Sequence, residues 1–231
     1  SFGLKINSES FSFLAEILPF NIVRKNLHDL HSLEALFLGT AGLLHGQRCN
    51  YQLQLNKSYG FLKKKYELNS LNPGHVQFFR LRPLNFPTIR LSQLAALYHK
   101  NTHLFSRFRH CNTITEIYDI FHVKASHFWD THYTFETKSK KKQKWVSKRF
   151  IDILIINVIV PLKYFYSSHS GISNRLDVIN LMESLKPERN SIISEFENLG
   201  IEVNNALISQ SLIQLKNNYF YKKRCLDCDI G

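Results

Sequence analysis

The apolar residues of the chain recur mainly at intervals of three and four, which is the spacing of one face of an α-helix. In residues 10–18 this spacing places Phe11, Leu14, Ala15 and Leu18 on one side. The same pattern predicts helices over 21–44, 50–67, 87–100, 113–122, 150–166, 174–185, 190–199 and 204–221. Almost no stretch alternates strictly between apolar and polar residues, so few strands are expected. The predicted fold class is mainly α, an irregular multi-helix array with few or no strands.

Residues that start and stop helices support several of these limits. Pro87 suits the first position of a helix, where its missing N–H costs nothing. Thr113 and Glu116 form a T-x-x-E capping box at the start of the next predicted helix. Gly200 suits a left-handed C-terminal cap.

The most apolar segment, 150–166, is a predicted helix that we expect to be buried on nearly all sides in a domain centre. Asp152, Asn157, Pro161 and Lys163 interrupt it. Its purely apolar part is therefore far shorter than the ~20 residues that a membrane-spanning helix needs. We expect no membrane span and, in the absence of a visible export signal, a cytoplasmic protein with reduced cysteines.

Charge is distributed unevenly along the 231 residues. Residues 1–175 hold 24 Lys and Arg against 10 Asp and Glu, whereas residues 176–231 hold 6 against 8. An excess of this kind favours a polyanionic partner, either nucleic acid or anionic lipid, although a merely basic protein is the alternative. We predict one helical domain over 1–231, with the basic segment 137–149 as the best candidate for an internal break.

The segment FRLRPLNFPTIRL places three arginines, Arg80, Arg82 and Arg90, around a junction between a loop and a helix. Free N–H groups at a helix start and guanidinium groups both attract anions, and Asn85 is a candidate cap for the helix. The sequence therefore predicts an anion or phosphate site here. The alternative is structural: the arginines pair with buried carboxylates and hold the loop in place.

Two further segments carry candidate nucleic-acid contacts. The segment FWDTHYTF brings Trp129, His132 and Tyr133 together, and aromatic side chains of this kind suit stacking on bases. The segment 137–149 contains seven Lys and Arg and is predicted to be an exposed loop that neutralises phosphates. The alternatives are core packing for the aromatic residues and a solvated loop for the lysines.

The chain ends with a C-x-x-C pair, Cys225 and Cys228, in a basic tail. Two thiolates at this spacing reach the same ion, which is why the pattern recurs in zinc sites. A structural site needs four ligands, and no second pair stands at the usual spacing. Zinc is therefore the candidate cofactor, with two ordinary reduced thiols or a redox pair as the alternatives.

Four segments in order along the chain are FRLRPLNFPTIRLSQLAAL, FWDTHYTF, IINVIVPL and KKRCLDCDIG. Together they resemble an uncharacterised bacterial protein family, domain of unknown function 2851. The resemblance implies an upstream region with acidic and histidine residues that this chain lacks. Some members carry a third cysteine before the pair, but Phe220 stands at that place here, which argues against a three-cysteine cluster. The resemblance carries no established activity.

The leading interpretation is a non-catalytic helical domain that binds nucleic acid or another polyanion. Two alternatives stay open: a scaffolding module with a protein partner and a zinc half-site, and part of an enzyme whose catalytic centre lies mainly upstream, with Asp130, His132 or Asp152 as acid–base groups. The chain has no Walker loop, G-x-G-x-x-G or G-x-S-x-G motif. The residues assigned to nucleic-acid binding are Arg80, Arg82, Asn85, Arg90, Trp129, His132, Tyr133, Lys140, Lys141, Lys142 and Lys144.

Overall fold

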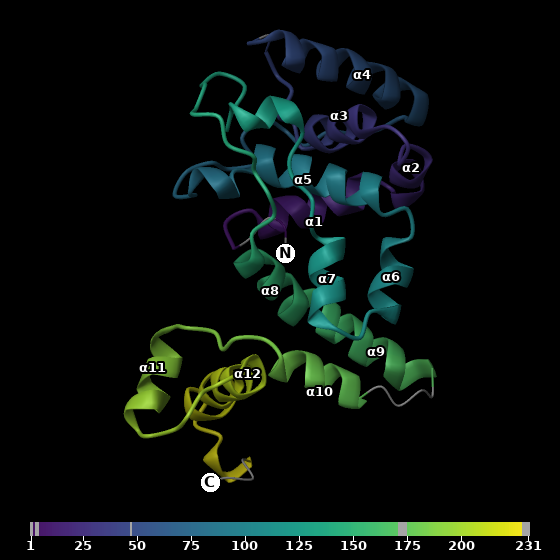
Figure 1. Cartoon of the computed structure of the whole chain (residues 1–231). Coiled ribbons are helices and arrows are strands. Elements are labelled where there is room, and N and C mark those ends of the chain that lie inside the picture. Colours follow the sequence, from purple (N-terminus) through teal and green to yellow (C-terminus); the bar gives the residue numbers. More distant parts are fainter. Residues whose placement is uncertain (1, 3–4, 47, 171–174, 228–231) are drawn as a thin grey trace. The chain divides into compact units, whose positions relative to one another are not determined.

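The computed structural model describes residues 2, 5–46, 48–170 and 175–227, and it is mainly helical, as the apolar spacing predicts (Figure 1). The described residues form no strand, only the isolated bridges Lys124–Trp145 and His132–Lys138. The α-helices are α1 (Ser8–Ile17), α2 (Phe20–Lys25), α3 (Leu30–Thr40), α4 (Asn50–Tyr66), α5 (Pro87–Lys100), α6 (Leu104–His110), α7 (Ile114–Ile120), α8 (Lys148–Leu154), α9 (Val160–Ser170), α10 (Arg175–Glu183), α11 (Ser191–Asn198) and α12 (Ala206–Leu215).

The contacts divide the chain into two compact units. The first unit comprises Ser1–Arg107 and Tyr118–Lys148, and the second unit comprises Phe108–Ile117 and Arg149–Gly231. The dividing lines fall inside α6 and α7 and at the first residue of α8. The prediction of one domain over residues 1–231 stays a prediction.

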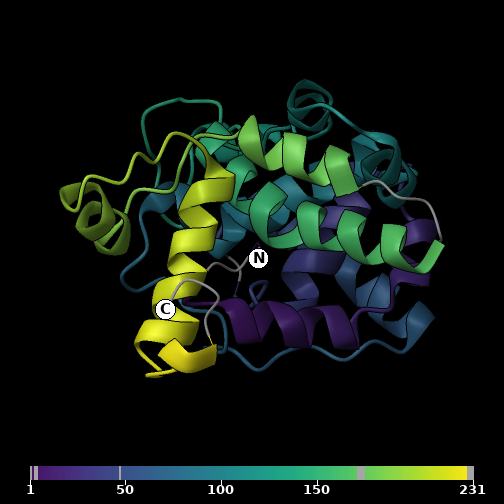
Figure 2. The same ribbon diagram turned by 90° about the horizontal axis from the view of Figure 1, so that it is seen from below.

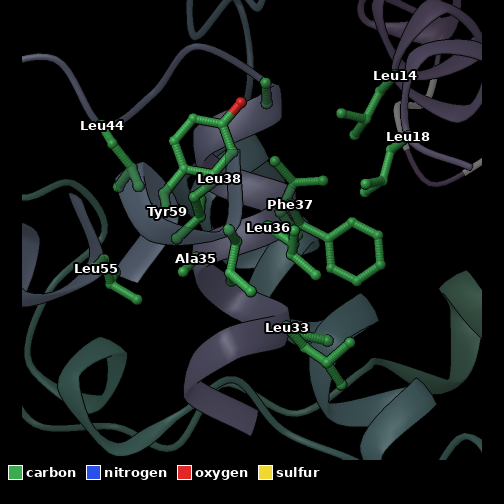
Figure 3. Close-up of a cluster of buried hydrophobic side chains, with 14 of the residues drawn as sticks. Leu14, Leu18, Leu33, Ala35, Leu36, Phe37, Leu38, Leu44, Leu55 and Tyr59 are labelled. Carbon is green, nitrogen blue, oxygen red and sulfur yellow. The ribbon is translucent and has the colours of Figure 1, made fainter. Parts of the chain in front are cut away.

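The core of the first unit is built around α3, whose Leu33 and Leu36 are fully buried. Helices α4 and α5 pack along it, and α1 contacts it from a third direction. Figure 3 shows Leu14 of α1 and Leu55 of α4 close to the side chains of α3. A helix that is apolar on nearly all sides is typical of a domain centre, and this position explains why α3 carries so few charges.

Gly39 lets α3 and α4 approach closely. A Cβ atom built at this position would lie 2.2 Å from the ring of Tyr59, which is buried against the last turn of α3. The Tyr59 hydroxyl in turn lies 3.0 Å from the Ser70 hydroxyl. Three residues after Gly39, Gly42 adopts a φ of +71° in the turn that follows α3. The two glycines, which look like weak points of a helix in the sequence, are required by the contact and by the turn.

The predicted helix 21–44 is two helices, because the chain breaks at Asp29. Asp29 is the N-cap of α3, and its carboxylate accepts hydrogen bonds from the backbone N–H groups of His31 and Ser32 at 3.1 Å and from the Ser32 hydroxyl. These hydrogen bonds outweigh the effect of burial, so the pKa of Asp29 lies below its ordinary value. Apolar spacing alone does not reveal this break, since Val23, Leu27 and Leu30 keep the helical interval across it.

Replacing Asp29 with alanine is expected to cost about 1 kcal/mol of unfolding free energy at pH 7, the usual effect of losing an N-cap. A lowered pKa in the folded state means that the ionised carboxylate stabilises the fold above its ordinary pKa of 3.8 and that this stabilisation is lost as the pH falls below it. Urea unfolding at pH 7 and pH 3 checks both statements. Glu16→Ala, at an exposed position of α1, is the control and is expected to change little.

The predicted helix 150–166 is helical but is not buried all round. It runs through α8, a π-helical turn (Ile155–Ile159) and α9. Pro161 lacks the N–H that a regular α-helical ladder would need, and a π turn just before it accommodates that loss. Ile155 and Ile159 are buried, whereas Val158 and Phe165 are exposed. None of the helices among the described residues is long and apolar enough to cross a membrane.

The second unit contains further capping interactions that follow the sequence signals. The capping box is confirmed: the Glu116 carboxylate accepts from the Thr113 N–H at 3.0 Å, and the Thr113 hydroxyl accepts from the Glu116 N–H at 3.3 Å. Gly200 has the predicted left-handed φ, +83°. The buried Lys163 of α9 donates hydrogen bonds from its ammonium group to the carbonyl oxygens of Arg109 and Cys111 at the end of α6. Helix α9 also packs beside α10 (Figure 2).

Candidate functional site

Arg90 occupies the interior of the first unit. Its guanidinium donates to the Asn85 side-chain oxygen at 2.6 Å and to the Gln93 side-chain oxygen at 3.0 Å, and only 4% of the residue is exposed. Burial lowers its pKa to about 10, which still leaves it charged at neutral pH. Arg90 therefore holds the 3₁₀ turn Pro83–Asn85 against α5. Its partners in these hydrogen bonds are side-chain amides, whereas the structural alternative expected buried carboxylates.

The other two arginines of this segment lie at the surface. Arg80 and Arg82 are both exposed, and Arg80 adopts a φ of +61°. The Arg80 guanidinium carbon lies 5.3 Å from the ring centroid of Phe79, itself 74% exposed. The three arginines therefore do not converge on one anion site, because Arg90 is buried whereas Arg80 and Arg82 are exposed to solvent.

Trp129 of the segment FWDTHYTF is completely buried, and its ring is part of a polar network in the core. The indole Nε1–H donates to one carboxylate oxygen of Glu34 at 3.1 Å, and the Tyr51 hydroxyl donates to the other. The Tyr51 oxygen also lies 2.9 Å from the Ser126 hydroxyl. Burial and the adjacent Glu34 carboxylate raise the pKa of Tyr51. Trp129 is thus unavailable for base stacking and is not part of the proposed interface.

The remaining residues of this segment pack against their neighbours. His132 is half-buried and stacks on Phe128, with ring centroids 4.2 Å apart, and the edge of Tyr133 faces Phe86. Asp130 is buried, and its Oδ1 has no hydrogen-bond partner among the described residues. Although Asp130 and His132 are close in the sequence, the described residues show no hydrogen bond between the Asp130 carboxylate and His132.

The basic segment was predicted to be an exposed loop, and its residues 137–147 are an extended chain that precedes α8. Backbone hydrogen bonds fix it, including those from the Ser139 N–H to the Thr131 carbonyl at 2.7 Å and from the Lys142 N–H to the Asp130 carbonyl at 2.8 Å. Lys140, Lys141 and Lys142 are exposed.

Lys144 does not share this exposure. It is fully buried, donates from its ammonium group to the Trp129 carbonyl oxygen, and lies 4.2 Å from the ring centroid of Tyr133. Burial lowers the pKa of Lys144, although the Asp130 carboxylate acts in the opposite direction. Because its ammonium group faces the core, Lys144 anchors the segment and does not belong to a surface that binds phosphate.

The cysteine pair falls at the end of the part of the chain that the structure describes. Cys228 and the side-chain environment of Cys225 lie outside the described residues, so the zinc half-site stays a prediction. Among the residues that the structure describes, no group of three or more His, Cys, Asp or Glu side chains is placed to hold a metal ion. Cys111 is buried, and the Cys49 sulfur accepts the Gln52 N–H as the N-cap of α4.

A cavity of about 460 Å³ is lined by residues of α2, α3, α4 and the chain between α2 and α3, and the sequence did not reveal it. We call it the lysine cleft. Basic side chains from two segments line it, together with hydroxyl, amide and aromatic groups, and its lining contains no Asp or Glu. The lining residues are Lys25, Asn26, His28, Ser32, Lys57, Ser58, Phe61, Leu62, Lys65 and Tyr66.

Two ammonium groups of the lysine cleft face the same aromatic ring. The Nζ atoms of Lys25 and Lys65 lie 5.8 and 5.2 Å from the ring centroid of Tyr66, and Lys65 is also 5.8 Å from the ring centroid of Phe61. Like charges that share one small region repel each other unless an anion neutralises them. Among the described residues, no carboxylate forms an ion pair with Lys25, Lys57 or Lys65.

The nearest acidic residue in sequence, Asp29, is already occupied. It accepts three hydrogen bonds at the start of α3, one of them from the hydroxyl of Ser32, a residue that also lines the cleft. These bonds, and not an ammonium group, compensate its charge. Asp29 therefore does not neutralise the lysines of the cleft, and it is not one of the residues that line it.

A second cavity in the first unit, of about 310 Å³, has a different character. His45, Arg48, Thr134 and Glu136 contribute to its lining, and Arg48 forms an ion pair with Glu136. Both members of that pair are more than half exposed, so it contributes little to stability. It does, however, cancel the positive charge of this cavity, which leaves the lysine cleft as the more strongly cationic of the two.

The net positive charge of the chain arises entirely in the first unit. That unit holds 20 Lys and Arg against 8 Asp and Glu, a net charge of +12, whereas the second unit holds 10 of each. A division of the sequence at residue 175 gives the same trend, with 24 Lys and Arg against 10 Asp and Glu before it and 6 against 8 after it. The lysine cleft therefore lies in the part of the molecule that carries the whole net charge of +12.

One signal in the sequence marks half of the lysine cleft. Lys57, Phe61 and Lys65 recur at intervals of four, so they share one face of α4, and no acidic residue lies within that helix. Lys25 and His28 come from a different segment, about 30 residues earlier, and no local pattern connects them with α4. Only the packing of α2 and α3 against α4 brings the two halves together.

Comparisons with curated proteins and with solved structures found no match. A family model described as "Protein of unknown function (DUF2851)" matches residues 1–191. The matched region contains the lysine cleft and all of the first unit, and it ends before the cysteine pair, which was part of the sequence resemblance. The match spans well over half of the 231 residues, so the chain belongs to the DUF2851 family, as the four segments predicted.

Proposed function

We propose that the first unit binds a polyanion, in the first place nucleic acid, and that the lysine cleft is its principal contact. The observation that carries the proposal is the convergence of Lys25, Lys57 and Lys65 on one cavity whose lining has no carboxylate. Phosphate groups supply the charge that these ammonium groups lack, and their binding releases counterions from the nucleic acid. The net charge of +12 on this unit would speed the encounter and add affinity at low salt.

The lysines of α4 have a simpler role that accounts for only part of the arrangement. Lys63, Lys64 and Lys65 occupy the last turn of α4, where cations stabilise the negative end of the helix dipole. Lys25 likewise lies in the last turn of α2, so the effect leaves Lys57, two turns earlier in α4, and the convergence of the three lysines on one cavity unexplained. The exposed Arg80, Arg82 and Lys140–Lys142 belong to the same positively charged unit and are proposed as secondary phosphate contacts.

The two other interpretations of the sequence have no specific support from this geometry. Asp130 and His132 line neither the lysine cleft nor the second cavity, so an acid–base pair has no substrate site beside it in these two places. The cysteine pair reaches beyond the described residues. Neither interpretation is therefore part of the proposed function.

Fluorescence anisotropy with labelled single-stranded and double-stranded oligonucleotides tests the proposal directly. We expect binding of the full chain in the micromolar range or tighter at ~50 mM salt, weakening steeply as the salt concentration rises, because each phosphate contact adds about 0.7–0.9 to the slope of log K against log salt. Cytochrome c, which is also basic and of compact size, is the control for charge alone. Binding no tighter than that of the control would contradict the proposal.

A further inference from the structure

The second half of the basic segment takes part in a short ribbon of two extended chain segments in the first unit. Residues 122–126 and 143–147 run antiparallel, joined by the Lys124–Trp145 bridge. The Ala125 N–H donates to the Lys144 carbonyl at 3.1 Å and the Val146 N–H donates to the Val123 carbonyl at 3.0 Å. Because side chains alternate along an extended chain, the ribbon has two distinct faces.

One face of the ribbon is buried and the other is polar, aromatic and open. Val123, Ala125, Lys144 and Val146 are buried. Of the alternate positions, His122, Gln143, Trp145 and Ser147 are exposed and Lys124 is half-exposed, whereas the Ser126 hydroxyl contacts the Tyr51 hydroxyl. We call this outward side the ribbon face.

Trp145 is the centre of the ribbon face. The residue is 40% exposed, and the His122 ring stacks on it with centroids 4.3 Å apart and planes inclined by 23°. Its Nε1–H donates to the Gln143 side-chain oxygen at 3.1 Å, and the Lys124 ammonium lies 5.6 Å from its ring centroid. These contacts fix the orientation of a large aromatic ring that remains at the surface, which is the arrangement that stacking on a flat ligand requires.

The charge next to Trp145 identifies the class of ligand. Lys138 and Lys140–Lys142 precede it in the same ordered segment and are exposed, and residues 138–149 contain no Asp or Glu. An aromatic ring beside a track of cations is typical of surfaces that bind single-stranded nucleic acid, in which bases stack on the ring and phosphates contact the lysines. Bases in a duplex are stacked on each other and are not free to do so.

We propose that the ribbon face is a base-stacking platform, with Trp145 as its stacking residue, and that the preferred ligand of the first unit is single-stranded nucleic acid. This inference rests on the proposed polyanion binding and narrows it. The stacking role that the sequence suggested for Trp129, which is buried, is thereby assigned to Trp145, the other tryptophan of the chain. Double-stranded nucleic acid, free polyphosphate and an anionic membrane surface share the attraction to lysine but offer no unpaired base.

The two tryptophans make the test direct, since Trp129 is buried and Trp145 is exposed. The full chain is titrated with a thymidine 20-mer, a duplex of 20 base pairs, inorganic polyphosphate and vesicles containing phosphatidylserine, while its intrinsic fluorescence is recorded. We expect the single strand to quench the emission and the duplex and polyphosphate to leave it nearly unchanged. The quenching should be absent in Trp145→Ala.

Affinity gives a second readout. Trp145→Ala is expected to bind the thymidine 20-mer about tenfold more weakly, in the range found when a stacking aromatic is removed. Its affinity for polyphosphate should not change, because no lysine is altered. Phe13→Ala is the matched control, since Phe13 is an exposed aromatic residue of α1 in the same unit. Circular dichroism confirms that both variants are folded.

The outcomes separate the two proposals. If all polyanions bind alike and Trp145→Ala retains its affinity for the single strand, the platform is refuted and polyanion binding stands. If vesicles quench the emission of Trp145 and the single strand does not, the ribbon face is a membrane contact and the platform is again refuted. If none of the four ligands binds, polyanion binding itself fails.

Discussion

Replacing Trp129 with alanine is expected to lower the unfolding free energy by about 4–5 kcal/mol, more than any other substitution proposed for this protein. Removal of a fully buried tryptophan ring costs ~3–5 kcal/mol through lost apolar contacts and the cavity left behind. The substitution also removes the indole N–H from the buried carboxylate of Glu34, and a buried charged group that loses a donor adds a further penalty. An effect of this size is a large part of the stability of a typical domain.

Urea unfolding followed by circular dichroism measures the effect, since the change removes one of the two tryptophan fluorophores. Trp145→Ala is the matched control, because the same chemical change at an exposed ring should cost less than about 1 kcal/mol. Should Trp129→Ala not fold, Trp129→Phe keeps most of the ring and loses the N–H, and a cost of about 2 kcal/mol is expected for it. A cost below about 1 kcal/mol for both variants would contradict the central role of Trp129.

Changing Lys25, Lys57 and Lys65 together to glutamate is expected to weaken polyanion binding about a hundredfold at ~0.1 M salt. Each lysine that neutralises a phosphate contributes through the release of a counterion, so losing three contacts should also reduce the slope of log K against log salt by about 2–3. The glutamates add repulsion at the rim of the lysine cleft. Anisotropy titrations at three salt concentrations measure the affinity and the slope together.

The control carries the same change in net charge at a different place. Lys186, Arg189 and Lys222 are exposed residues of the second unit, and their change to glutamate should weaken binding by less than about tenfold. A triple change to glutamine in the cleft tests whether the glutamates merely disturb the last turn of α4. Equal losses in the cleft triple and in the control triple would show that net charge, and not the lysine cleft, governs binding.

Local sequence signals predicted most of the helices because each depends on residues within a few positions of one another. Pro87 at the start of α5, the Thr113–Glu116 box and Gly200 after α11 all mark the expected boundaries. The failure at Asp29 has a physical cause: an aspartate is tolerated in a helix or caps one, and apolar spacing that continues across it does not distinguish the two. The short helix α6 was missed, since only Phe108 of its residues is buried.

The candidate site was predicted less well, because burial is decided by contacts between distant segments. Arg90, Trp129 and Lys144 look like surface cations and an aromatic contact in the sequence, yet each is buried. Arg90 is hydrogen-bonded to amide groups of its own segment, whereas Trp129 and Lys144 are hydrogen-bonded to groups more distant in the sequence. Lys25 and Lys65 illustrate the converse. Their separation of 40 positions hides the fact that both face one tyrosine ring.

The contact between Gly39 and Tyr59 makes two positions of the chain depend on each other. Since the missing side chain at residue 39 is what admits the tyrosine ring, a variant with even a methyl group at residue 39 has to accept a smaller residue at 59 or move α4 away from α3. Because α4 also carries Lys57 and Lys65, such a shift would widen the lysine cleft. The absence of a side chain at Gly39 therefore helps to set the distance between α3 and α4, and with it the spacing of the lysines proposed to bind phosphate.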